Sequence, residues 1–122
     1  MTGPSRSLGG VRSAAISNAL VGLYRRHFGK GPAQAKTYLL DDVVICLFEG
    51  GTLRIEETLE QAGQSQVVDD FRRAFRRTAR DEFVETIEQQ TGRQVRASLS
   101  QYDSEHDIAC WVFLLAPTTG TN

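Results

Sequence analysis

The chain has 122 residues, which is enough for one compact domain with a hydrophobic core. Its 14 lysines and arginines against 15 acidic residues give a net charge of -1, so no overall basic excess draws the chain onto nucleic acid or an anionic membrane. No apolar run approaches the roughly 20 residues that span a bilayer, and the start, MTGPSRSLGG, lacks the apolar segment of a secretory signal. We therefore expect a cytoplasmic protein that is not embedded in a membrane.

The composition of residues 1–10 and 117–122 is typical of disordered ends, which leaves a single domain over 11–116. This domain begins with apolar residues that recur every three to five positions, a spacing that predicts a helix. Gly29 is available for a left-handed cap at its end, and Pro32 prevents its continuation.

Two strands are predicted next, at 37–40 and 43–49, with a tight turn at Asp41-Asp42 between them. A short helix follows over 53–63. A long helix over 64–92 carries its apolar residues in a single stripe.

The last two strands are predicted at 95–100 and 108–116, with a polar hairpin loop at 102–107. The order is helix, strand, strand, short helix, long helix, strand, strand. It predicts a two-layer α+β domain whose four-stranded, mainly antiparallel sheet carries the helices on one face.

The segments VVICLF and IACWVFLL are apolar at every position, so both faces of these strands are apolar. Two main helices can cover only one face of the sheet. Burying apolar area contributes on the order of 25 cal/mol per Å², so we expect a second copy on the other face, in a homodimer or a higher homo-oligomer. The candidate interface residues are Trp111, Phe113, Phe48 and Cys46.

The two cysteines, Cys46 and Cys110, lie inside these apolar runs, where a thiol usually behaves as a small buried hydrophobe. In a reducing compartment we expect no disulfide between them. The chain has no CxxC pair and no Cys/His cluster with ligand spacing, which excludes a structural zinc site. We expect no metal and no cofactor.

The stretch RRHFGKGP, residues 25–32, allows two interpretations. Backbone N–H groups around its glycines, flanked by basic side chains, can form a nest for phosphate, carboxylate or bicarbonate. A capped helix followed by a turn explains the glycines and the proline equally well, and the stretch lacks the spacing of a phosphate-binding loop. The candidate anion-binding residues are Arg25, Arg26, Gly29, Lys30 and Gly31.

Five arginines of the long helix form a basic arc beside its apolar stripe: Arg72, Arg73, Arg76, Arg77 and Arg80. Such an arc can bind an acidic partner, a nucleotide phosphate or an anionic headgroup. Asp69 and Asp81 each lie four residues from an arginine and neutralise part of its charge, and the arc has no aromatic residues for base stacking. An ordinary solvated helix face is the alternative.

The hairpin sequence YDSEHD contains acidic groups and a histidine, but neighbouring residues at a hairpin tip do not readily aim at a common point, and we interpret it as a polar turn. The chain shows no arrangement of acid, base and nucleophile. We therefore expect that this protein is not an enzyme.

Four segments, SNALVGLYRRHFGKGP, LRIEETLEQAG, VVDDFRRAFRRTARDEFVETIEQQTGRQV and DIACWVFLLAP, resemble the MpsC family over roughly residues 12–117. The most specific stretches are GKGP at 29–32, EETL at 56–59, FRRAF at 71–75 and TGRQV at 91–95. The matched candidate binding positions are Gly29, Lys30, Gly31, Pro32, Arg72 and Arg73.

The resemblance implies a small cytoplasmic protein associated with a sodium-translocating system that generates membrane potential, whose membrane components are linked to bicarbonate or inorganic-carbon uptake. It supplies no catalytic residue. The main hypothesis is a dimeric, non-enzymatic accessory or regulatory module whose partner is a membrane transporter or a regulatory protein. The alternatives are a sensor of small anions or nucleotides, which would use the GKGP turn and the arginine arc, and a nucleic-acid binder supported only by that arc.

Overall fold

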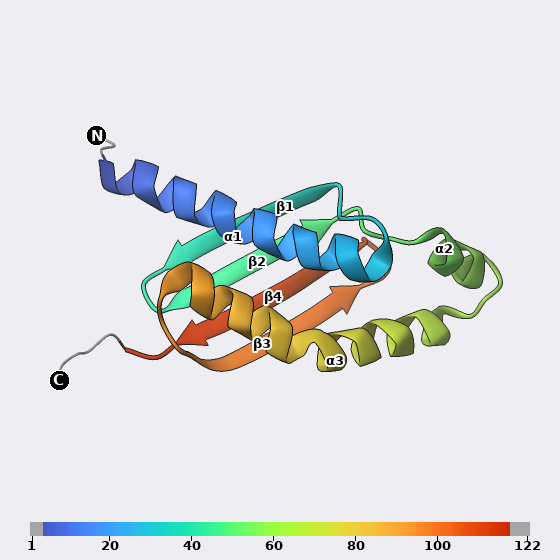
Figure 1. Ribbon diagram of the computed structural model, residues 1–122. Helices are drawn as coiled ribbons and strands as arrows, with labels where there is room; N and C mark the ends of the chain where they lie inside the picture. The colour runs from blue at the N-terminus through green and yellow to red at the C-terminus, as the bar shows by residue number, and fades with distance from the viewer. Residues whose placement is uncertain (1–3, 118–122) are drawn as a thin grey trace.

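The computed structural model describes residues 4–117, which form three helices and one sheet (Figure 1). Every neighbouring pair of strands is antiparallel, and the order across the sheet is β1-β2-β4-β3, so β1 and β3 are the edge strands. The elements in chain order are α1 (Pro4–Phe28), β1 (Gln34–Leu40), β2 (Val43–Glu49), α2 (Arg54–Gln61), α3 (Ser65–Thr91), β3 (Val95–Asp103) and β4 (Ile108–Leu115).

The two long helices lie on the same face of the sheet (Figure 1). α1 packs over β1, α3 packs over β3, and the two helices also contact each other. The short α2 lies beyond one end of the sheet, where it packs against α3. The predicted two-layer α+β domain, with helices on one face, is confirmed.

The core lies between this sheet face and the two long helices. On β2 and β4, buried side chains alternate with half-buried ones. Trp111 of β4 stacks on Phe83 of α3, with ring centroids 4.3 Å apart, and donates its Nε1–H to the hydroxyl oxygen of Tyr24 of α1 at 2.9 Å. A single side chain thus connects the sheet to both covering helices.

The predicted interface residues lie in this core instead of at a surface. Trp111, Phe113, Phe48 and Cys46 are each at most 3% exposed within the single chain. They face the helices, and the residues that alternate with them face the other way. Only that second set is accessible to another copy.

α1 begins at Pro4, so residues 4–10 are helical although their composition predicted disorder. Proline is tolerated in the first turn of a helix because the N–H that it lacks has no partner there. Residues 1–3 and 118–122, which belong to the two predicted disordered ends, lie outside the described part of the chain. β3 continues to Asp103, which leaves only residues 104–107 for the hairpin loop.

The two cysteines are free and lie on opposite faces of the sheet. Cys46 pairs across β2 and β4 with Trp111 in the core, whereas Cys110 pairs with Leu47 on the other face. The sheet therefore separates the two thiols, which keeps them from bonding to each other within one chain.

Candidate functional site

The GKGP turn ends helix α1 and is bonded to the protein itself. Gly29 has φ of 81° and donates its N–H to the carbonyl oxygen of Arg25 at 2.9 Å, which is a left-handed cap. Lys30 Nζ donates to the carbonyl oxygen of Thr52 at 2.9 Å. These contacts support the capping interpretation of the turn over the anion nest.

The basic residues before the turn connect α1 to α3. His27 Nε2 lies 2.7 Å from Glu82 Oε1, and Arg26 forms an ion pair with the same carboxylate. Arg25 is exposed. The structure therefore places Arg26 and His27 on the side of α1 that contacts α3, whereas the guanidinium of Arg25 lies beside Gly31 of the turn.

The predicted arginine arc is divided between two environments. Arg72 is only 3% exposed, whereas the other four arginines are exposed or half-buried and line a groove. Arg72 therefore belongs to the interior, and only part of the arc is a surface feature.

Arg72 forms a forked ion pair with Glu56, which is 1% exposed. Its Nε lies 2.6 Å from Oε2 and its Nη2 lies 2.6 Å from Oε1, so the pair is bidentate. The guanidinium also lies over the rings of Phe28 and Tyr102, at 4.8 and 4.2 Å from their centroids. Burial acts to lower the pKa of Arg72, but the hydrogen bond and charge of Glu56 outweigh it and raise the pKa.

A second set of hydrogen bonds surrounds this pair. Asp107 accepts the backbone N–H groups of Gly51 at 3.2 Å and Thr52 at 3.1 Å. The hydroxyl of Tyr102 donates to Asp107 Oδ1 at 3.1 Å. Burial raises the pKa of Tyr102 to about 12, so the phenol remains protonated near neutral pH. We call Glu56, Arg72, Tyr102, Asp107 and the Gly51-Thr52 backbone the Arg72 cluster.

The Arg72 cluster has the character of a structural connection more than that of a reaction centre. The cavity beside it, which Lys30 and Phe28 also line, has a volume of about 10 Å³, the space of a single water molecule. Its acidic and basic groups are bonded to one another. The Arg72 cluster therefore holds α2, α3 and the β3–β4 hairpin against one another.

Sequence reasoning did not find this cluster. It noted the EETL and FRRAF stretches without pairing Glu56 with Arg72, and it placed Asp107 in a polar turn. The available signal was Glu56 in the first turn of a predicted helix, where its Oε1 accepts the N–H of Leu53 at 2.8 Å. Acidic residues in a first helical turn are common, so this signal alone does not identify a buried ion pair.

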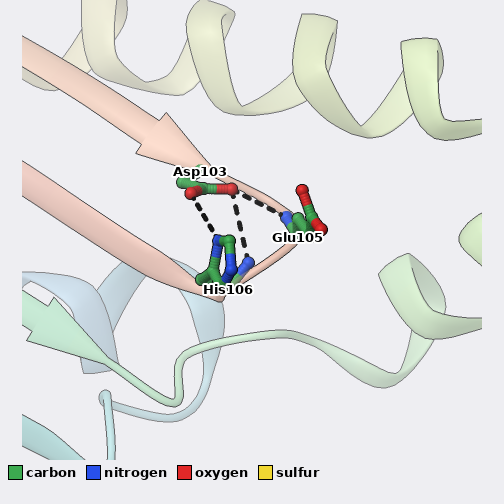
Figure 2. Close-up of side chains that lie close together, drawn as sticks. All are labelled: Asp103, Glu105 and His106. Carbon is green, nitrogen blue, oxygen red and sulfur yellow. Dashed lines mark hydrogen bonds and ion pairs between the residues drawn. The ribbon is translucent and has the colours of Figure 1, made fainter.

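The side chains at the tip of the β3–β4 hairpin form a compact polar turn (Figure 2). Asp103 Oδ1 accepts the N–H groups of Glu105 and His106 at 3.0 and 3.3 Å, and Asp103 Oδ2 lies 2.8 Å from His106 Nδ1. The hydrogen bond to His106 lowers the pKa of Asp103, and the same bond raises the pKa of His106. Asp103, Glu105 and His106 each offer one atom of a type that binds metal ions, and these atoms lie within 4.8 Å of one another. All three residues are exposed, however, and the carboxylate of Asp103 is already hydrogen-bonded within the turn.

The four remaining arginines of the arc line a groove between α3 and the edge strand β3, with a volume of about 290 Å³. β3 contributes Ser98 and Ser100 beside Phe113 and Trp111 of β4, and these small side chains leave the groove hollow. We call it the arginine groove, and it is lined by Arg73, Arg76, Arg77, Arg80, Ser98, Ser100, Gln101 and the buried Trp111.

The sheet face opposite the helices is apolar at its centre, and no other described element covers it (Figure 1). In its middle row, Ile45 pairs with Tyr38 on one side and Val112 on the other, and Val112 pairs with Leu99. Tyr38 and Leu99 are 43% and 63% exposed. We call this surface the open face, and its apolar residues are Tyr38, Leu40, Val43, Ile45, Leu47, Ala97, Leu99, Ile108, Cys110, Val112 and Leu114.

No helix in the described part of the chain is both long and apolar enough to cross a membrane. The fold and its surfaces define a small α+β domain whose sheet has one helix-covered face and one open face. The chain belongs to the MpsC family, described as a Na+-translocating membrane potential-generating system, whose sequence model matches residues 10–117. No curated protein and no solved structure matches the chain.

Proposed function

We propose that this MpsC protein is a non-enzymatic accessory protein of a sodium-translocating system in the cytoplasm, and that it acts as a homodimer formed through the open face. The family description supports an association with such a system. The Arg72 cluster supports the absence of catalysis, since its polar groups are occupied with one another. The link to bicarbonate or inorganic-carbon transport is inferred from the family resemblance.

The open face carries the dimer proposal because its middle row is apolar across all four strands and no other described element covers it. Its apolar positions span five residues on β2, seven on β4 and three each on β1 and β3. With strands about 4.8 Å apart and a rise of about 3.4 Å per residue, the patch measures roughly 20 Å across the strands and about 15 Å along them on average. Its flat area of about 300 Å² lies at the lower end of the range for the largest apolar patch on a typical monomer, about 300–600 Å², so the continuity of the patch supports the dimer more than its area does. Two copies face to face bury about twice that flat area, so the polar rim around the patch has to supply the rest of the roughly 1,000 Å² that a specific interface needs.

A second copy is the occupant that this face fits best. In a twofold interface each central residue meets the same residue or its neighbour, so a charged centre would repel itself. The central Ile45 and Val112 are uncharged, while Lys36 and Glu49, of opposite sign, lie toward the rim. Two twisted sheets stack about 10 Å apart at about -30°, which is a common packing of sheet faces.

Sedimentation or light scattering at micromolar concentration tests the dimer. Leu99→Glu places a charge on the open face and should produce a monomer. Ile55→Glu is the matched control, since Ile55 is 59% exposed but lies on α2, away from the sheet. A monomeric wild-type protein, or a Leu99→Glu variant that remains dimeric, contradicts the proposal.

The accessory role has its own test. Affinity capture of the tagged full chain from its native cells should recover subunits of a sodium-translocating membrane system, and the dimeric Ile55→Glu variant should recover the same set. Recovery of no transport or regulatory protein counts against the accessory role while leaving the dimer intact.

A further inference from the structure

The arginine groove concentrates positive charge that the protein itself compensates poorly. Arg73, Arg76, Arg77 and Arg80 are spaced i, i+3, i+4 and i+7, so they occupy one side of α3. Arg73 pairs with Asp70 at 3.4 Å and Arg80 pairs with Asp81 at 3.1 Å. Both pairs are exposed single contacts, which contribute little and are screened by salt.

Arg76 provides an independent sign that the groove binds a ligand. Its Nη1 is buried and has no hydrogen-bond acceptor among the residues that the structure describes. A buried charged donor without an acceptor is costly, so such donors are rare unless a ligand, ion or water completes them. Burial lowers the pKa of Arg76, and the nearby charges of Arg73 and Arg72 lower it further.

β3 supplies neutral polar groups that face these arginines. Ser98 and Ser100 pair with Phe113 and Trp111 of β4, so they point to the helix side of the sheet. Arg80 Nε donates to Ser98 Oγ at 3.1 Å, which holds that guanidinium against the strand. The hydroxyl groups can donate to an anion that the guanidinium groups attract.

We propose that the arginine groove binds the phosphate group of a small anion, held by Arg76, Arg77 and Arg80 and by the hydroxyl of Ser98 or Ser100. Phosphate carries more charge and more acceptor oxygens than a single carboxylate or bicarbonate, so it can engage several guanidinium forks at once. The volume of about 290 Å³ accommodates a phosphate with a small attached group. Asp69, Asp103 and Glu105 line the adjoining hollow and keep the anion at the Arg76 to Arg80 end.

The site differs from the one predicted from sequence. Arg72 is paired with Glu56, and the GKGP turn is bonded to the protein, so neither takes part. The groove lies on the helix side of the sheet, opposite the open face. Phosphate binding and dimer formation are therefore independent, and each can fail without the other.

Calorimetric titration and thermal shift of the full-length protein with inorganic phosphate and pyrophosphate test the proposal, with sodium chloride at matched ionic strength as the reference. We expect saturable binding, tighter for pyrophosphate. The double variant Arg76→Gln/Arg80→Gln should lose at least about tenfold in affinity, since hydrogen bonds to charged groups are strong. Arg12→Gln/Arg54→Gln removes the same charge from exposed positions outside the groove and should bind within about twofold of wild type.

Four outcomes overturn the proposal: no saturable binding at about 10 mM phosphate or pyrophosphate, equal loss in both double variants, no loss in Arg76→Gln/Arg80→Gln, or bicarbonate binding as tightly as phosphate. Circular dichroism and thermal unfolding without ligand establish that the groove variant is folded. Adenosine monophosphate distinguishes the source of the phosphate group. Affinity above that of inorganic phosphate supports a nucleotide, and equal affinity supports a free phosphate.

Discussion

At the scale of single residues, Arg72 shows how one side chain can hold several elements in place. Its guanidinium pairs with Glu56 from α2, donates to the carbonyl oxygen of Gly51 at 3.0 Å, and stacks on rings from α1 and β3. A buried pair of this kind has a large desolvation cost, which its bidentate geometry offsets. Its removal therefore differs greatly from the removal of a surface pair.

We expect Arg72→Met to lower the free energy of unfolding by about 3–5 kcal/mol, because it leaves the carboxylate of Glu56 buried without a partner. Arg73→Met breaks an exposed pair on the same helix and should cost less than about 0.5 kcal/mol. Urea unfolding at neutral pH measures both values. Similar losses in the two variants would show that Arg72 is not the buried connection described above.

Two buried acidic groups predict that stability falls in alkaline solution. Burial raises the pKa of Tyr24 from 10.0 to about 12 and the pKa of Cys46 from 9.0 to about 12. Both groups are neutral in the folded state. Their contribution to the free energy of unfolding is therefore complete below their unfolded pKa values and is lost as the pH rises toward 12. For Tyr24 this loss is about 3 kcal/mol.

Urea unfolding at a series of pH values from 8 to 11.5 should therefore show a free energy that begins to fall near pH 9. In Cys46→Ala the fall between pH 9 and 10 should be smaller, because the buried thiol of residue 46 is removed while Cys110, Tyr24 and Tyr102 still have raised pKa values. A wild-type free energy that is constant up to pH 11 would contradict the burial of these groups.

At the scale of helices and strands, the sequence was sufficient to predict the bounds of an element where its local signals agree. The apolar runs predicted β2 at its observed bounds, and Gly92 ends α3 in the left-handed conformation that its position predicted. The start of α1 at Pro4 was missed because Gly9 and Gly10 reduce helix propensity locally. The ion pair between Glu56 and Arg72 was not predicted because it depends on how α2 packs against α3, which no local pattern encodes.

Gly50, at the end of β2, and Gly63, after α2, have the same φ of 76° but different surroundings. A Cβ at Gly50 would lie 2.6 Å from the Cβ of Ala33, whereas a Cβ at Gly63 meets nothing within 4 Å. Gly63→Ala should cost about 1–2 kcal/mol for the left-handed backbone alone. Gly50→Ala should cost about 1–3 kcal/mol more, because the contact with Ala33 forces the β2 exit to shift.

Thermal and urea unfolding of the two variants measures this difference. Both variants place alanine at the same positive φ, so this backbone cost cancels in the comparison. The remaining difference is the cost of the close contact with Ala33. Equal destabilisation would mean that the loop after β2 adjusts freely and that its bonds to Ala33 and Asp107 do not fix it.

At the scale of the whole molecule, the sequence indicated that both faces of β2 and β4 are apolar but not which face the helices cover. Cys46 and Cys110 illustrate the ambiguity, since each lies in an uninterrupted apolar run and only the packing of α1 and α3 separates them. The structure buries Cys46 under the helices and leaves Cys110 half-buried on the open face. The candidate interface residues Trp111, Phe113, Phe48 and Cys46 were therefore chosen from the face that the helices cover.

Cys110 offers a direct probe of what covers the open face. It lies between Leu47 and Gln101 in the sheet, close to the middle row of the patch. In a Cys46→Ala background it is the single thiol of the chain, and alkylation by iodoacetamide near pH 8 reports its accessibility. Burial raises its pKa even in the single chain, so the reaction is slow enough to follow by mass spectrometry.

If a second copy covers the open face, the alkylation rate of Cys110 should fall as protein concentration rises, because the monomer is the reactive species. Adding Leu99→Glu should make the rate fast and independent of concentration, whereas adding Ile55→Glu should preserve the protection. A rate that does not change with concentration in the Cys46→Ala protein would mean that no second copy lies on this face. Protection that persists in the Leu99→Glu variant would place the contact elsewhere on the sheet, because a charge beside Val112 is incompatible with an apolar interface there.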